Sequence, residues 1–203
     1  MADAPSFYWP RQGDKAFAVH GSPGDPSLVA AFVLPSTGGY AVGFKDAADK
    51  VVEAAASDDR NPDLLFFPVA YLYRHSLELS LKDIVRMSAR SGAISPSEGD
   101  LDKLLGGHDL LCLWRQTRAA IEAVWPDGEK SDTDAVEKII LEFHGLDKSG
   151  QAFRYPTDKS GRPHVGSAPK CVSLQNLKRT FDAMDRFLDA AFTGIDGCDP
   201  GLP

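Results

Sequence analysis

Apolar residues recur at three- and four-residue steps in five separate stretches of the chain, which is the period of one helix face. The longest stretch covers about residues 64–91, and the others cover about 41–56, 108–124, 133–144 and 173–192. Short connections between successive helices suit antiparallel neighbours. The pattern therefore predicts an all-α protein, a bundle of five helices.

Local signals predict where several of these helices begin and end. Either His108 or Asp109 should cap the third helix, and Ser173 should cap the last, because short polar side chains accept hydrogen bonds from free backbone N–H groups. Gly145 is a good C-terminal cap for the fourth helix. Residues 91–107 are rich in glycine and polar side chains and predict a loop.

The remaining segments are expected to surround the bundle, which covers residues 41–192. Residues 1–40 form an N-terminal arm, whose two apolar runs suit either short strands or extended segments packed on the helices. Residues 153–164 predict an ordered loop or a short hairpin before the last helix. Residues 193–203 predict a flexible tail.

Composition fits one domain with its own core, since the 203 residues are 43% hydrophobic and 25% charged. The formal charge of −7 gives no general attraction to nucleic acid, so any RNA contact has to be local. No run of 18 apolar residues suggests a membrane span, and no signal-peptide pattern opens the chain. We expect a cytoplasmic protein.

The three cysteines argue against a disulfide framework or a zinc knuckle. Cys112, Cys171 and Cys198 are odd in number and form no Cys-x-x-Cys pair. Cys112 lies among leucines and is expected in the core. The same apolar setting argues against a nucleophilic role for its thiol.

A polar stripe runs along the longest predicted helix, opposite its apolar face. Tyr71, His75, Glu78 and Lys82 form the stripe, with Arg74 at its edge. A stripe of this kind is either a solvated helix face or a polar site. Its composition alone favours the solvated face.

Two patterns in the sequence have the letters of a metal site. His75 and Glu78 stand three residues apart, as ligands do in some helical-bundle metal sites. His75 followed by the pair His108-Asp109 also has the letters of a metal phosphohydrolase. That pair should follow an apolar run within a helix, whereas here it follows Gly106-Gly107. We therefore expect no metal ligands and no cofactor.

The sequence resembles the HEPN superfamily, the higher eukaryotes and prokaryotes nucleotide-binding domains. The resemblance rests on Glu78-Leu79-Ser80-Leu81-Lys82, then Gly92, then Gly107-His108-Asp109-Leu110 with Leu113, and covers about residues 64–125. It implies a small helical bundle that forms a homodimer. Many members are endoribonucleases of toxin–antitoxin or antiviral systems, and others are inactive or bind nucleotides. Active members carry an Arg, four to six residues and then a His, a motif that this chain lacks.

Two functions follow from the resemblance. The first is an RNA-acting protein, a ribonuclease with a catalytic site at His75, His108 and Arg154 in a dimer cleft. The second is a non-catalytic bundle that binds a partner protein or a nucleotide. The implied binding residues are Arg74, Glu78, Lys82, Asp109, Tyr155 and His164.

Arg154 also has a structural interpretation. An arginine flanked by aromatic residues usually packs its stem on the core and pairs with a carboxylate. We expect Glu78 to pair with Arg154 or with Lys82, and we place this role ahead of RNA stacking by Tyr155.

Overall fold

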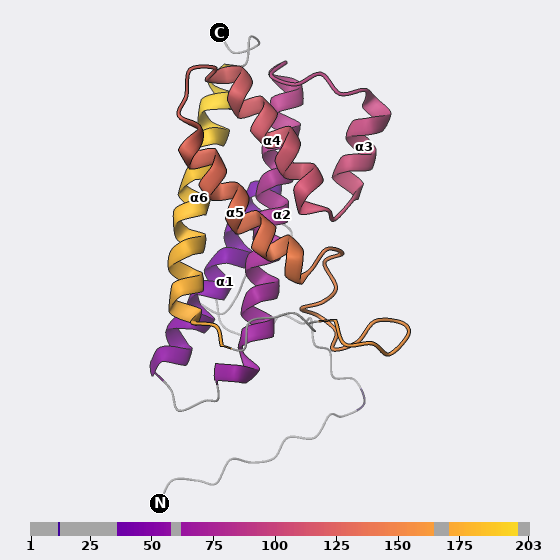
Figure 1. The fold of residues 1–203 in the computed structure, drawn as a ribbon, viewed down its shortest axis with the longest axis vertical. Coiled ribbons are helices and arrows are strands. Elements are labelled where there is room, and N and C mark those ends of the chain that lie inside the picture. The colour runs from indigo at the N-terminus through magenta and orange to yellow at the C-terminus, as the bar shows by residue number, and fades with distance from the viewer. Residues whose placement is uncertain (1–11, 13–35, 58–61, 165–170, 199–203) are drawn as a thin grey trace, which may run out of the picture. The chain divides into compact units, whose positions relative to one another are not determined.

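The structure, a computed structural model, describes Gln12 and residues 36–57, 62–164 and 171–198. Helices dominate these residues, and no strand occurs among them, so the predicted all-α class is confirmed (Figure 1). The helices are α1 Thr37–Ser57, α2 Phe66–Arg90, α3 Glu98–Gly106, α4 Leu110–Val124, α5 Lys130–Leu146 and α6 Leu174–Asp196, with a 3-10 turn at Pro62–Leu64.

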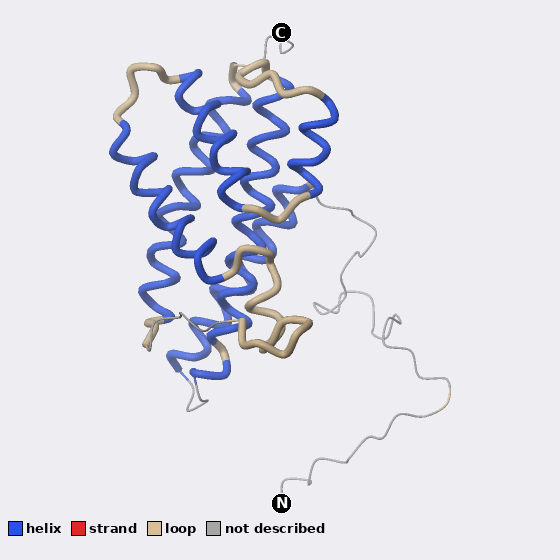
Figure 2. The backbone as a smooth tube through the Cα atoms, turned by 45° about the vertical axis from the view of Figure 1, so that its right-hand side comes forward, coloured by secondary structure: helices blue, strands red, loops and turns tan. Residues whose placement is uncertain are grey.

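Figure 2 shows the helices side by side in one bundle. Helix α2 is the centre of the bundle and packs against α1, α4 and α6. Its apolar face is completely covered, because these three helices enclose it on several sides. Tyr73 of α2 stacks on Phe181 of α6 with ring centroids 4.4 Å apart. The most deeply buried apolar side chains of α2 are Val69, Tyr73, Leu77, Leu81, Ile84 and Val85.

A cluster of charged side chains joins α1, α2 and α6 beside this core. The Tyr73 hydroxyl donates a 2.5 Å hydrogen bond to Asp49 Oδ1. Lys45 contacts both Asp49 and Asp182, and Lys178 contacts the same two carboxylates. Burial, and then the bond to Asp49, raise the pKa of Tyr73. The cluster fixes α6 against α1 by alternating charges.

Two predicted helix caps are confirmed. Asp109 precedes α4 and accepts hydrogen bonds from the backbone N–H groups of Leu111 and Cys112. Ser173 precedes α6 and accepts one from Asn176. The polar residue before each apolar stretch therefore set the start of the helix.

The loop predicted for residues 91–107 is wrong in part, because α3 lies within it and brings the number of described α-helices to six. The Ser97 hydroxyl accepts a hydrogen bond from the Asp100 N–H and caps this short helix. Leu101, Leu104 and Leu105 pack against the core. Three leucines are enough to hold α3 in place, because the helix only covers the surface of α4. The other residues of α3 remain exposed.

The ends of two other helices also differ from the predictions. Helix α6 continues to Asp196, so residues 193–196, which were predicted as tail, are helical; Ile195 is fully buried and anchors the last turn. Helix α5 includes Gly145 and ends at Leu146 instead of at the glycine. Helix α1 begins at Thr37, within the predicted arm. The two apolar runs of the arm lie outside the described residues.

The structure also tests what the sequence predicted for Cys112 and for residues 153–164. Cys112 is exposed, contrary to its predicted place in the core, because it lies on the outer side of α4 while Leu113 and Trp114 face inward. The predicted hairpin at residues 153–164 is present as one antiparallel bridge between Thr157 and Pro163. Among the described helices, none is both long and apolar enough to cross a bilayer.

Candidate functional site

The polar stripe of α2 forms a buried network of charges. Arg74, Glu78 and Lys82 are four residues apart and therefore share one helix face. Glu78 Oε2 accepts a 2.9 Å hydrogen bond from Arg74 Nη1, and Glu78 Oε1 accepts a 2.8 Å bond from Lys82 Nζ. All three side chains are buried, with Glu78 only 2% exposed. The solvated face that the stripe favoured is wrong for these residues.

The segments that cover the network come from distant parts of the sequence. Arg74 Nη2 donates a 2.8 Å hydrogen bond to the carbonyl of His108, just before α4. Arg74 Nε donates a 3.0 Å bond to the carbonyl of Asp147, just after α5. The Asp147 carboxylate lies 3.4 Å from the same nitrogen. One guanidinium thus ties α2 to the start of α4 and the end of α5.

Sequence reasoning missed Asp147 and Gly150, which complete this arrangement. Asp147 Oδ1 accepts a hydrogen bond from the Gln151 N–H and closes the turn that follows α5. Gly150 has a φ of +75°, and a Cβ atom there would lie 3.2 Å from Arg74 Nη1. The glycine lets the backbone approach the guanidinium closely. A separation of 73 residues hides the contact between Arg74 and Asp147 from any local pattern.

The charges of the network compensate one another, two cations against two carboxylates. Burial alone would raise the pKa of Glu78. The hydrogen bonds from Lys82, His108 and Arg74 outweigh burial and lower this pKa to about 2. Glu78 is therefore ionised throughout the neutral range, as a carboxylate between two cations must be.

His108 is the exposed member of the site. Its Nδ1 lies 2.8 Å from Glu78 Oε1, while 58% of its side chain is exposed. A neutral imidazole bonded in this way carries its proton on Nδ1 and leaves Nε2 as the acceptor. The buried carboxylate therefore fixes both the orientation and the tautomer of a histidine at the protein surface.

His75 lies on the same helix but in a different setting. Its ring stacks on Tyr71 at 5.8 Å and meets the edge of Phe44 at 4.5 Å. Burial is the largest effect on its pKa, which is lowered from the ordinary value. His75 is therefore mainly neutral at pH 7 and forms part of an aromatic stack.

Arg154 joins that stack from the loop after α5. Its guanidinium carbon lies 5.7 Å from the centroid of the Tyr71 ring and 5.9 Å from that of Tyr155. Its Nε donates a 2.8 Å hydrogen bond to the Gly150 carbonyl. We call Tyr71, Arg154 and Tyr155 the aromatic surface. Tyr155 and Arg154 are both exposed.

The predicted pairing of Glu78 is therefore correct for Lys82 and wrong for Arg154. Arg74 already occupies the second carboxylate oxygen of Glu78. Arg154 lies on aromatic rings instead of in a buried ion pair, because its loop passes along the outside of the network.

Asp109 and His164, two other predicted site residues, have local roles. Asp109 caps α4; burial would raise its pKa, but the Cys112 N–H and the nearby His144 lower it. The His164 N–H donates to the Pro156 carbonyl within the hairpin. Among the described contacts, none brings the ring of His164 to the buried network.

The described residues hold no group of three or more His, Cys, Asp or Glu side chains arranged to bind a metal ion. The site thus has two parts, an exposed histidine on a buried carboxylate and a guanidinium near two tyrosine rings. Gly150 links the two parts, because it contacts both Arg74 and Arg154. No family model, curated protein or solved structure matches this chain.

Proposed function

We propose that this chain is a HEPN-type, RNA-acting protein of the cytoplasm in which His108 is the general base of phosphodiester cleavage. The observation that carries the proposal is the 2.8 Å contact between His108 Nδ1 and a buried, fully ionised Glu78. A histidine held by a carboxylate is the common arrangement for proton transfer near neutral pH. The HEPN resemblance supplies the substrate class.

The chemistry requires a single proton acceptor at the reacting ribose. His108 Nε2 takes the proton of the 2′-hydroxyl, and the 2′-oxygen attacks the adjacent phosphorus. The bond from phosphorus to the 5′-oxygen breaks, and solvent water protonates the leaving oxygen. Glu78 stabilises the imidazolium that forms. The products are a 2′,3′-cyclic phosphate and a 5′-hydroxyl end.

The aromatic surface gives RNA a local binding place on an acidic protein. Bases stack on exposed tyrosines, and a guanidinium contacts phosphate or a base face. Gly150 connects the two parts of the site, because its carbonyl binds Arg154 while its backbone lies against Arg74. Tyr155 and Arg154 are therefore the binding residues in this proposal.

Cleavage of a defined single-stranded RNA tests the proposal, with His108→Asn beside the wild type. An asparagine amide can still donate to Glu78, so the fold should be kept while proton transfer is lost. We expect a loss of about 100-fold or more in cleavage rate, and no change for Lys103→Ala on exposed α3. Equal cleavage by wild type and His108→Asn would refute the role of His108.

A second function has its own supporting observation. The buried cations Arg74 and Lys82 are already neutralised by Glu78 and Asp147, which leaves them little capacity to bind phosphate. We therefore propose, as the alternative, a non-catalytic bundle that binds a nucleotide or a protein partner. RNA binding that Arg154→Ala weakens, without cleavage by the wild type, would favour the alternative.

We also propose that the chain forms a homodimer, as HEPN domains commonly do. Exposed large apolar side chains on α1 and α2 support this proposal, namely Tyr40, Val42 and Phe67. Light scattering at tens of micromolar should give twice the mass of 21.9 kDa. A monomer mass would remove the dimer and with it the proposed dimer cleft.

A further inference from the structure

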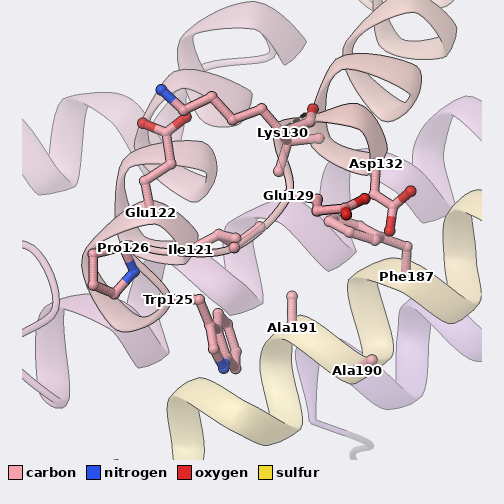
Figure 3. Close-up of a pocket in the computed structure, with 12 residues that line it drawn as sticks. Ile121, Glu122, Trp125, Pro126, Glu129, Lys130, Asp132, Phe187, Ala190 and Ala191 are labelled. Carbon is pink, nitrogen blue, oxygen red and sulfur yellow. Dashed lines mark hydrogen bonds between the residues drawn. The ribbon is translucent and has the colours of Figure 1, made fainter.

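A separate cavity lies at the end of α4, far along that helix from His108. It has a volume of about 400 Å³ and is bounded by the turn from α4 to α5 and by the C-terminal half of α6. Figure 3 shows Trp125, Ile121, Phe187 and Ala191 around its apolar part. Cavities of this size accept small organic molecules.

Trp125 forms one wall of the cavity and remains 41% exposed. Its ring packs directly on Gly194 of α6, where a Cβ atom would overlap the edge of the indole ring. Only glycine allows this contact. The N–H of Trp125 donates to the Ile121 carbonyl and closes α4. The backbone hydrogen bond to Ile121 and the ring contact with Gly194 therefore both hold Trp125 in place.

Two carboxylates, those of Glu129 and Asp132, occupy one side of the rim. Figure 3 shows them next to each other above Phe187. Among the described residues, neither carboxylate takes part in a hydrogen bond or an ion pair.

The two cationic side chains of this region, Arg118 and Lys130, lie toward carboxylates other than Asp132. Arg118 pairs with Glu122, and Figure 3 shows Lys130 extending toward Glu122 and away from Asp132. From residue 118 to residue 137 the sequence has six carboxylates and two cations. The N-terminus of α5 offsets part of this charge, but the local excess of negative charge remains at the rim.

We propose that this cavity binds a small organic cation, an amine carried on an aromatic body. The apolar walls exclude water from the aromatic body of the ligand, which can stack on the ring of Trp125. Glu129 and Asp132 then neutralise the ammonium at the rim. A ligand with a carboxylate or phosphate in the same place would be repelled. This site is independent of the proposed function.

Two probes with one aromatic body and opposite charge test the proposal. Titration calorimetry of the full chain with tryptamine should show one site, and indole-3-acetate should bind at least about tenfold more weakly. The double variant Glu129→Gln with Asp132→Asn should bind tryptamine about tenfold or more weakly than the wild type. Its affinity for indole-3-acetate should not fall. Asp102→Asn, an exposed carboxylate of α3, is the matched control and should change neither affinity.

A blocking variant locates the binding. Ala190→Phe places a ring in the cavity from α6 and should abolish tryptamine binding while circular dichroism shows a native helix content. Tryptamine binding that survives Ala190→Phe would place it elsewhere and overturn the proposal. Equal affinities for the two probes, or no tryptamine binding at millimolar concentration, would overturn it as well. These outcomes do not bear on RNA cleavage, which has its own assay.

Discussion

Replacing Glu78 by glutamine should destabilise the protein by about 3 kcal/mol at pH 7. The carboxylate is 2% exposed and holds both Arg74 and Lys82, so the variant leaves two buried cations with reduced compensation. The lowered pKa gives the same magnitude: the difference between about 2 in the fold and the ordinary 4.5 corresponds to about 3 kcal/mol.

The stability that Glu78 contributes should depend on pH, because folding changes the pKa of its carboxyl group. Because folding lowers the pKa of Glu78, its contribution is fully present above pH 4.5 and is lost as the pH falls toward 2. The difference in stability between wild type and Glu78→Gln should therefore shrink in acid. Urea unfolding followed by circular dichroism at pH 7 and at pH 3 measures both values.

A matched control and a double variant sharpen this test. Glu142→Gln on the exposed side of α5 should change stability by less than about 0.5 kcal/mol. Glu78→Gln combined with Lys82→Met should cost less than the sum of the single variants, since the two side chains form one pair. A loss below about 0.5 kcal/mol for Glu78→Gln, or a loss equal at both pH values, would refute the buried network.

Three further predictions concern other contacts. Tyr73→Phe removes the hydroxyl bond to Asp49 and should cost about 1–2 kcal/mol in urea unfolding; an unchanged midpoint would contradict that bond. Gly150→Ala should cost more than Gly92→Ala, because both have positive φ but only Gly150 has a side chain in the space a Cβ would need; equal losses would contradict the close approach. NMR titration of His75 should give a midpoint below 6.5, so that its protonation reduces stability as the pH falls; a midpoint above 6.5 would contradict burial as the largest effect on this pKa.

The sequence by itself determined the helices and several of their ends. A helix face needs apolar residues at fixed local steps, and α2 and α6 display them over more than twenty residues each. The caps Asp109 and Ser173 act within three residues of their own position, so they could also be predicted. Helix α3 was missed because nine residues carry too few apolar repeats to distinguish them from a loop.

Only the tertiary structure decided which polar residues act together. The pattern placed Arg74, Glu78 and Lys82 on one face but could not show that the start of α4 and the end of α5 cover this face. The partner Asp147 is 73 residues from Arg74, and the choice of Arg74 over Arg154 for Glu78 depends on where a loop passes. Burial and charge pairing are properties of contacts between distant segments, and they exist only once the helices have packed.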